Sequence, residues 1–393
     1  MLIWGAGMAG YIARRLIRAA ITLATFQTIL FLLIHAVPWD AVDLMRLPAG
    51  YERGLRQVLG LDLPLWEQYL MWMRGFFTGD LGRSFQLGGA PVMSLFLARI
   101  PRTLLLFLPG ALIGFGLGLW LGKYTAWWRG GLLELGATTA GIVFYTSFAP
   151  WLAFTLVTVF AIGLNWLPAE NIINPNVWIG TKVLTESIAW RLLFTFTLDF
   201  LLALFIWHAT RRKPLRTWFR LGCIFLLAGL TTYLWRVSGL AVFALDILYH
   251  LVLPLITLVL LTFGETMLLM RSAMIDILAD DHVLTARAKG LESHQIMERH
   301  VARLAIFPVL SRFIVQLPLV IVGSFVIEKV FFWQGMGELL FRAVDSYDLP
   351  VVMGILSIVG ALILVFHVIL DILIAWLDPR LRESVLPLLP HRS

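Results

Sequence analysis

The chain has 393 residues, of which 60% are hydrophobic and 14% are charged. Soluble domains carry about a quarter charged residues, and this chain has a mean hydropathy of +0.85, so the composition excludes an ordinary water-soluble protein. The formal charge of +7 could indicate a nucleic-acid partner, but the basic residues form short clusters between apolar runs, as in cytoplasmic loops, and we expect no nucleic acid. The single cysteine, Cys223, excludes a disulfide framework and a cysteine-based metal site.

Long apolar runs follow one another along the chain. They cover residues 20–36, 103–121, 140–162, 192–207, 221–235, 248–270, 307–327 and 351–376. Because a helix needs about 20 apolar residues to cross a bilayer, these runs predict about eight transmembrane helices in one all-α integral membrane protein. The first run lacks a clear small-residue cleavage pattern, which predicts a retained helix rather than a signal peptide. The apolar stretch 237–247 could extend the fifth run, lie at the interface or merge with the sixth run.

Basic residues predict the orientation of these helices. They precede the first run and follow the second, fourth, sixth and eighth runs, as Arg14, Arg15, Arg18, Lys123, Arg129, Arg211, Arg212, Lys213, Arg216, Arg271, Arg287, Lys289, Arg299, Arg303, Arg380 and Arg382. With eight crossings all of these groups fall on one side, and the positive-inside rule then places both termini in the cytoplasm. The loop 38–102 also carries arginines, but at about 60 residues it is long enough for the rule to lose force.

Two loops are too long to be simple connections. The outer loop 38–102 places glycines among aromatic residues such as Trp66 and Trp72, which predicts short amphipathic helices on the membrane face. The loop 272–311 mixes helix-forming residues with alternating charge, and it predicts one or two helices outside the membrane.

A short motif lies within the loop 272–311. Its residues are Thr285, Ala286, Arg287, Ala288, Lys289 and Gly290. The two small alanines allow another backbone to approach closely, and the glycine permits a sharp turn after a helix. The two basic residues offer charge to a partner, although an amphipathic helix without a partner would have the same features.

The motif resembles the coupling-loop motif of ABC importer permeases, in the form typical of the dipeptide, oligopeptide and nickel branch. Other segments of the same branch occur in the expected order. They are Gly-Leu-Asp-Leu-Pro at 60–64, Gly-Asp-Leu-Gly-Arg-Ser at 79–84, Leu-Pro at 253–254 leading to Arg-Ser-Ala-Met at 271–274, Val-Ile-Glu at 326–328, Gly-Met-Gly at 335–337 and Asp-Pro-Arg at 378–380. The resemblance covers residues 11–170 and 248–382.

The chain departs from the family pattern at several places. The acidic residue that names the motif is absent, as is usual for this branch; Gln334 replaces a frequent proline and Leu268 a frequent arginine. The largest departure is an insertion, residues 174–247, which carries two further apolar runs. We therefore expect a six-helix permease core in segments 1–173 and 248–393, with an added helical hairpin between them.

The resemblance implies the transmembrane permease subunit of an ATP-driven, binding-protein-dependent importer in the cell membrane, with dipeptides or oligopeptides as the expected substrates. Its implied partners are a second, homologous permease, two cytoplasmic ATPase subunits, an outer solute-binding protein and membrane lipid. ATP and Mg would be used by the ATPase subunits, and no cofactor or metal is expected on this chain. The motif would dock on an ATPase and couple it to the translocation path.

Charged side chains inside apolar runs are costly, so they mark a transport pathway or a structural pair. The candidates are Glu265, Arg271, Glu328 and Asp371, with Asp199 in the insertion. Glu265 fits a pathway role and a polar pair equally well. Glu328 is expected at an exposed helix end, and Asp371 in a structural pair close to Asp378 and Arg380.

Other functions remain as alternatives. No Walker-type phosphate loop, nucleophile elbow or metal-ligand spacing occurs in the sequence, so no enzymatic activity is expected. An ion-coupled secondary transporter would need acidic residues at broken helices, and often an inverted repeat. A membrane-embedded enzyme or scaffold is a third class, and within the same branch nickel or another small solute is the alternative substrate. Co-purification of an ATPase would separate these classes.

Overall fold

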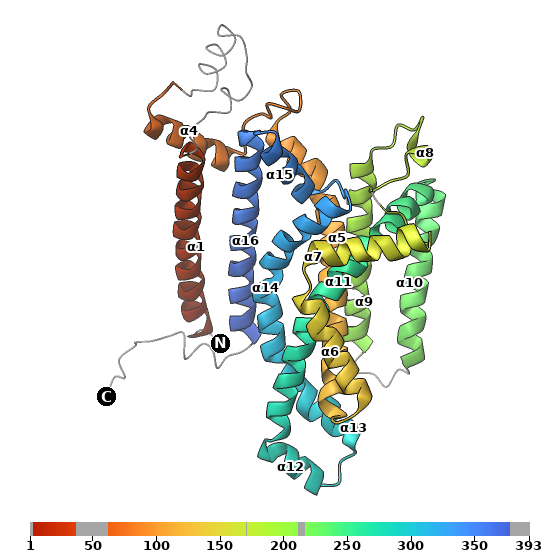
Figure 1. The fold of residues 1–393 in the computed structure, drawn as a ribbon. Coiled ribbons are helices and arrows are strands. Elements are labelled where there is room, and N and C mark those ends of the chain that lie inside the picture. The colour runs from red at the N-terminus through yellow and green to blue at the C-terminus, as the bar shows by residue number, and fades with distance from the viewer. Residues whose placement is uncertain (1–2, 37–61, 170, 211–216, 378–393) are drawn as a thin grey trace, which may run out of the picture. The chain divides into compact units, whose positions relative to one another are not determined.

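In a computed structural model, the chain is helical (Figure 1). The structure describes residues 3–36, 62–169, 171–210 and 217–377, and these form helices and turns without a β-strand. The helices are α1 (Ile3–His35), α4 (Leu65–Thr78), α5 (Val92–Trp127), α6 (Leu132–Thr146), α7 (Ala149–Leu156), η1 (Val157–Gly163), α8 (Pro175–Trp178), α9 (Thr185–Thr210), α10 (Thr217–Val237), α11 (Ala241–Leu278), α12 (Asp281–Ala288), α13 (Ser293–Gln295), η2 (Ile296–Val301), α14 (Ala302–Val330), α15 (Met336–Asp345) and α16 (Leu349–Leu377). The all-α membrane fold expected from the sequence is confirmed.

The number of helices that can cross a membrane is lower than the predicted eight. Among the described residues, six helical segments are long and apolar enough, or seven if α6 with α7 and η1 counts as one broken span. The predicted run 140–162 is not one helix, because the chain bends by 111° between α6 and α7. Ser147 ends α6 in an extended conformation and Pro150 sits in the first turn of α7, where proline is favoured. In α10 the apolar stretch Leu221–Val237 is shorter than the other candidate spans.

Several helices extend beyond the runs that predicted them. The helix α5 begins at Val92, inside the predicted outer loop 38–102, and α11 continues to Leu278, inside the predicted loop 272–311. Most of the uncertain stretch 237–247 merges with the sixth run, because α11 begins at Ala241, whereas Val237 ends α10. The predicted boundary at residue 247 therefore falls inside a helix.

Two compact units make up the chain, and each is described by itself. The first comprises Met1–Phe96, Leu310–Pro318 and Leu340–Ser393, and the second Leu97–Val309 and Leu319–Leu339.

In the first unit, α1 packs against α16. Arg15 forms an ion pair with Asp371, with 2.7 Å between Nη1 and Oδ2, and the buried Ser357 hydroxyl donates to Oε1 of Gln27 over 2.8 Å. Because position 15 meets 371 and position 27 meets 357, the two helices are antiparallel. The helix α4 lies across the end of α1 (Figure 1), where the Tyr69 hydroxyl and the Thr28 hydroxyl are 2.8 Å apart.

In the second unit, α11 is the helix on which the others assemble. Glycines recur every four residues on α5, at positions 110, 114, 118 and 122, and a side chain at any of them would collide with α11. At Gly118, for example, a Cβ atom would lie 2.7 Å from the Phe263 carbonyl oxygen. Such small-residue stripes let two membrane helices approach closely, since van der Waals packing replaces the hydrophobic effect inside a bilayer.

The segment 174–247 contains α8, α9, α10 and the first residues of α11, and α9 and α10 lie side by side (Figure 1). The Thr231 hydroxyl of α10 donates to Oδ1 of Asp199 in α9 over 3.1 Å, so Asp199 has a partner within the hairpin. Ile188 and Leu192 of α9 are buried in the same apolar cluster as Leu105 of α5 and Ile247 of α11. The hairpin thus shares a hydrophobic core with its neighbours.

Candidate functional site

The predicted coupling motif forms the end of a short helix. Its first four residues, Thr285 to Ala288, lie in α12, and Lys289 ends that helix. Gly290 follows with φ +74°, in the left-handed region that favours glycine. The amides of Gly290 and Leu291 donate to the carbonyl oxygens of Arg287 and Ala286 over 2.9 and 3.3 Å. This is the usual way in which glycine stops a helix.

One face of α12 is fixed to the rest of the second unit. Val283 is fully buried and Ala286 is 4% exposed. Both belong to an apolar cluster, here called the α12 cluster, whose buried members are Ala126, Met270, Met274, Val283, Ala286, Ile296, Met297, Val301, Ala302, Ala305 and Val309. The cluster joins α12 to the ends of α5 and α11, to η2 and to the start of α14. Since packed side chains have low compressibility and transmit strain, a force on α12 would be passed to the end of α11.

The opposite face of α12 is exposed. Leu284 is 54% exposed, and Thr285, Arg287, Ala288 and Lys289 are exposed beside it. On this face the apolar Leu284 lies between exposed carboxylates at the start of α12, Asp280 and Asp281, and basic side chains at its end. Such a face suits a partner surface that has an apolar depression and charges of both signs.

Two ion pairs flank the α12 cluster. Lys123 near the end of α5 lies 2.6 Å, Nζ to Oε1, from Glu298 of η2. Arg271 of α11 pairs with Glu134 in the first turn of α6. Arg271 is thus in a pair between helices, which is one of the two roles that the sequence left open for it. Glu265, one and a half turns earlier on α11, is half-buried.

Glu328 lies in a different environment from the one the sequence predicted. The prediction placed it at an exposed helix end, but its side chain is fully buried in the second unit. Its Oε2 atom accepts hydrogen bonds from the amides of Gly337 and Glu338 over 2.7 and 3.4 Å. The Thr103 hydroxyl oxygen accepts the preceding amide, that of Met336, over 2.8 Å. Two side chains from other helices therefore accept hydrogen bonds from the first amides of α15, which have no backbone acceptor within their own helix.

The turn before α15 needs glycine because the Glu328 side chain and the α14 backbone lie very close to it. A Cβ atom at Gly335 would lie 2.5 Å from the Glu328 carboxylate, and one at Gly337 would lie 2.3 Å from the Phe325 Cα. The motif Gly335-Met336-Gly337 is thus a consequence of close backbone approach around a buried carboxylate. The adjacent Trp333 is fully buried and donates from Nε1 to the Arg102 carbonyl oxygen over 2.9 Å.

Arg102 connects this turn to the hairpin. Its Nη1 atom donates to the Gln334 carbonyl oxygen over 3.1 Å, and its Nη2 atom lies 3.4 Å from Oε2 of Glu186. Nη2 also donates to the Thr185 hydroxyl. The start of α9 is therefore bound to the same turn that Glu328 caps.

Asp371 forms a structural pair, as expected, but its partner comes from another helix. It pairs with Arg15 of α1, whereas Asp378 and Arg380 lie outside the described residues. The site residues of the sequence prediction thus fall into three places: α12 with the turn that ends it, the polar contacts of α11 and α14, and the α1–α16 pair.

The helices and the motif helix define a multi-pass membrane protein with an exposed helix at one end. The chain matches the family model of the binding-protein-dependent transport system inner membrane component over residues 114–383, and the model of the N-terminal part of such components over residues 8–106. The chain belongs to this family of inner membrane permeases.

Several curated proteins are similar over almost their whole length. The di/tripeptide transport system permease protein DppB of Pseudomonas aeruginosa is 30% identical, with 96% of this chain and 100% of the relative covered. The oligopeptide transport system permease protein AppB of Bacillus subtilis is 27% identical over 95% of this chain and 99% of the relative. The dipeptide transport system permease protein DppB of Escherichia coli is 27% identical over 96% and 100%. The resemblance to the peptide branch of ABC importer permeases is confirmed.

Proposed function

We propose that the chain is the transmembrane permease subunit of an ATP-driven importer of dipeptides or oligopeptides, and that α12 docks on a cytoplasmic ATPase subunit. The observation that carries the proposal is the two-sided character of α12. One face is packed into the α12 cluster, and the other presents Leu284, Arg287 and Lys289. A helix that is both fixed and exposed can receive a force from a partner and pass it on.

The transmission follows from the contacts of α12. Movement of its exposed face displaces Val283 and Ala286, which carry the end of α11 through Met270 and Met274. The pair Lys123–Glu298 joins η2 to α5, so α5 follows. Two helices then shift in response to the ATP state of the partner, which alternates access to the path. In this proposal ATP and Mg are bound by the ATPase subunits, both termini are cytoplasmic, and a homologous permease and an outer solute-binding protein complete the importer.

The substrate class follows from the relatives. Three of them are named for dipeptide, di/tripeptide or oligopeptide transport. Uptake of radiolabelled di- and tripeptides by cells that carry or lack the chain tests this assignment. ATP-dependent uptake of a nickel chelate in place of peptides would move the chain to another substrate within the same family.

A pull-down of the tagged chain in mild detergent tests the docking. We expect the eluate of the natural chain to contain an ATPase subunit and to hydrolyse ATP. The double variant Leu284→Asp/Arg287→Glu places a charge at the apolar centre of the contact, and it should retain about tenfold less ATPase. Arg18→Glu is the matched charge reversal on an exposed residue of α1 and should keep the ATPase bound. An ATPase retained equally by all three proteins would remove α12 as the docking element, and a chain that binds no ATPase would favour an ion-coupled transporter.

A further inference from the structure

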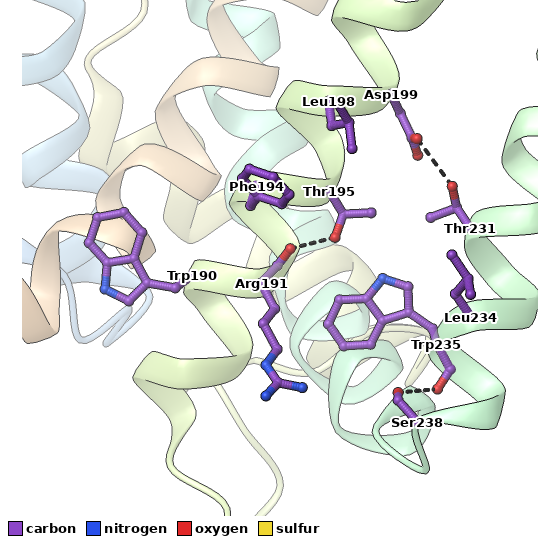
Figure 2. A pocket seen from close by; sticks show the side chains of 10 residues that line it. All are labelled: Trp190, Arg191, Phe194, Thr195, Leu198, Asp199, Thr231, Leu234, Trp235 and Ser238. Carbon is purple, nitrogen blue, oxygen red and sulfur yellow. Dashed lines mark hydrogen bonds between the residues drawn. The ribbon is translucent and has the colours of Figure 1, made fainter.

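A groove runs along the contact between α9 and α10, apart from the coupling helix and its cluster. Its volume is about 520 Å³, within the range of ligand pockets. Trp190, Phe194 and Leu198 line it from α9, and Leu234 and Trp235 line it from α10 (Figure 2). On α9 the three apolar positions recur every four residues and form one continuous apolar face, whereas on α10 the two apolar side chains lie between Thr231 and Ser238.

The length of the groove along the axis of α9 matches the thickness of one leaflet of a bilayer. Between positions 190 and 199 the helix α9 rises by about 13 Å, close to half of the hydrocarbon core of about 30 Å. The groove ends where Thr231 donates to Asp199, two of its lining residues (Figure 2). A partner helix would cross both leaflets and extend past this end, whereas an acyl chain of one leaflet would not.

The walls of the groove suit a hydrocarbon chain. Its three lining hydroxyls already have acceptors inside the hairpin: Thr195 donates to the Arg191 carbonyl oxygen, Thr231 to Asp199, and Ser238 to the Trp235 carbonyl oxygen (Figure 2). The hydroxyls therefore require no polar ligand. Apart from the half-buried Asp199 carboxylate at the closed end, the walls that face the groove are mainly aromatic and aliphatic.

The open end of the groove carries a positive charge. The Arg191 side chain is exposed and points away from Asp199, toward the end of the hairpin where α9 begins (Figure 2). Among the described residues no carboxylate pairs with its guanidinium. A second groove of about 340 Å³, between the hairpin and α11, has Arg236 in its lining. Arginine and tryptophan at the end of an apolar groove are typical of the zone of lipid headgroups.

We propose that the groove between α9 and α10 binds an anionic phospholipid, with the headgroup phosphate on Arg191 and one acyl chain along Phe194 and Leu198. Arginine binds phosphate with two parallel hydrogen bonds, which fixes the headgroup at the groove mouth. The hairpin then holds a lipid as a fixed part of the second unit.

Native mass spectrometry of the full chain, purified in mild detergent with any subunits it retains, tests the proposal. The protein is titrated with phosphatidylglycerol or with phosphatidylcholine of the same acyl chains. We expect the natural chain to retain phosphatidylglycerol in preference, and Arg191→Gln to lower that retention about fivefold, the factor for one basic residue near an anionic surface. Lys182→Gln is the matched control, because Lys182 is exposed just before α9 and does not line the groove; its retention should equal that of the natural chain.

A second pair of variants tests the acyl chain separately from the charge. Leu198→Trp fills the groove and should lower retention of both lipids, whereas Leu201→Trp, at an exposed position of α9 outside the groove, should not. Equal retention of the two lipids by the natural chain, or unchanged retention in Arg191→Gln, would overturn the proposal. So would a photocrosslinker at position 194 that captures a polypeptide in place of lipid.

Discussion

Single residues decide the geometry at both ends of the second unit. Gly290 has a positive φ, and no atom lies within 4 Å of where its Cβ would be, so the backbone conformation alone requires glycine there. Gly335 is required for the opposite reason, because its Cβ would collide with a buried carboxylate. Glycine is thus required at position 290 by the backbone conformation and at position 335 by the lack of space for a side chain.

Replacement of Gly290 separates coupling from insertion. Gly290→Val should cost about 1–3 kcal/mol at the end of α12, because a β-branched residue is strained in the left-handed region. Gly290→Asn is the matched control, since asparagine tolerates this conformation. We expect ATP-dependent uptake to fall in the valine variant and to be nearly kept in the asparagine variant, with equal amounts of both in the membrane. Equal uptake by the two variants would show that the helix end plays no part in coupling.

Replacement of Glu328 tests the buried cap of α15. Glu328→Leu leaves the Gly337 and Glu338 amides without an acceptor, at a cost of about 1–3 kcal/mol for each buried donor. Glu328→Gln keeps one carbonyl acceptor at the same place. Thermal unfolding in detergent should therefore show a larger fall in Tm for the leucine variant than for the glutamine variant. A larger fall in Tm for the glutamine variant than for the leucine variant would mean that a polar side chain at position 328 does not stabilise the start of α15.

At the scale of helices, sequence patterns predicted the elements better than their contacts. All eight apolar runs became helical, yet hydropathy could not show the bend at Ser147, because it counts apolar side chains and ignores backbone conformation. The burial of Glu328 could not be predicted from the sequence either, because the fold alone brings the amide of Gly337 to its carboxylate. The glycine spacing on α5 was not part of the prediction, and the helix that it contacts is brought to it only by the fold.

The stripe on α5 gives a prediction with an internal control. Gly118→Ala places a methyl group 2.6 Å from the Thr266 Cβ, whereas Gly116→Ala, on the same helix, meets nothing within 4 Å. Overpacking at position 118 should cost about 1–3 kcal/mol, while position 116 should gain up to about 1 kcal/mol of helix propensity. The Tm of the two variants in detergent should move in opposite directions. A common fall would mean that close contact with α11 does not explain the effect of filling position 118.

At the scale of the whole chain, short motifs predicted the family, whereas the substrate class is a proposal and the orientation depends on the charge of the loops. The motif 285–290 and the segments around it predicted the family, which the matches over residues 8–106 and 114–383 confirm. The membrane side of each terminus remains a prediction from basic residues. The role of the segment 174–247 as an insertion also remains a prediction.

Labelling of introduced cysteines tests the orientation. In a Cys223→Ser background, which removes the single native thiol, Arg287→Cys should react with a membrane-impermeant maleimide only in inside-out vesicles. Lys182→Cys should react only in right-side-out cells, because α11 connects the two regions across the bilayer. Reaction of both positions from the same side would invalidate the proposed topology.

The unbroken length of α11 has a mechanical consequence. Its 38 residues correspond to about 57 Å at 1.5 Å per residue, nearly twice the thickness of a hydrocarbon core of about 30 Å. Pro254 lies inside α11, where proline removes one backbone hydrogen bond, yet the helix continues to Leu278. In a continuous helix of that length, a tilt of about 5° about one end displaces the other by about 5 Å, one helical pitch. In the proposed importer, a small rotation imposed at Met274 would therefore become a lateral step of several ångströms at Ala241, without any helix having to unfold.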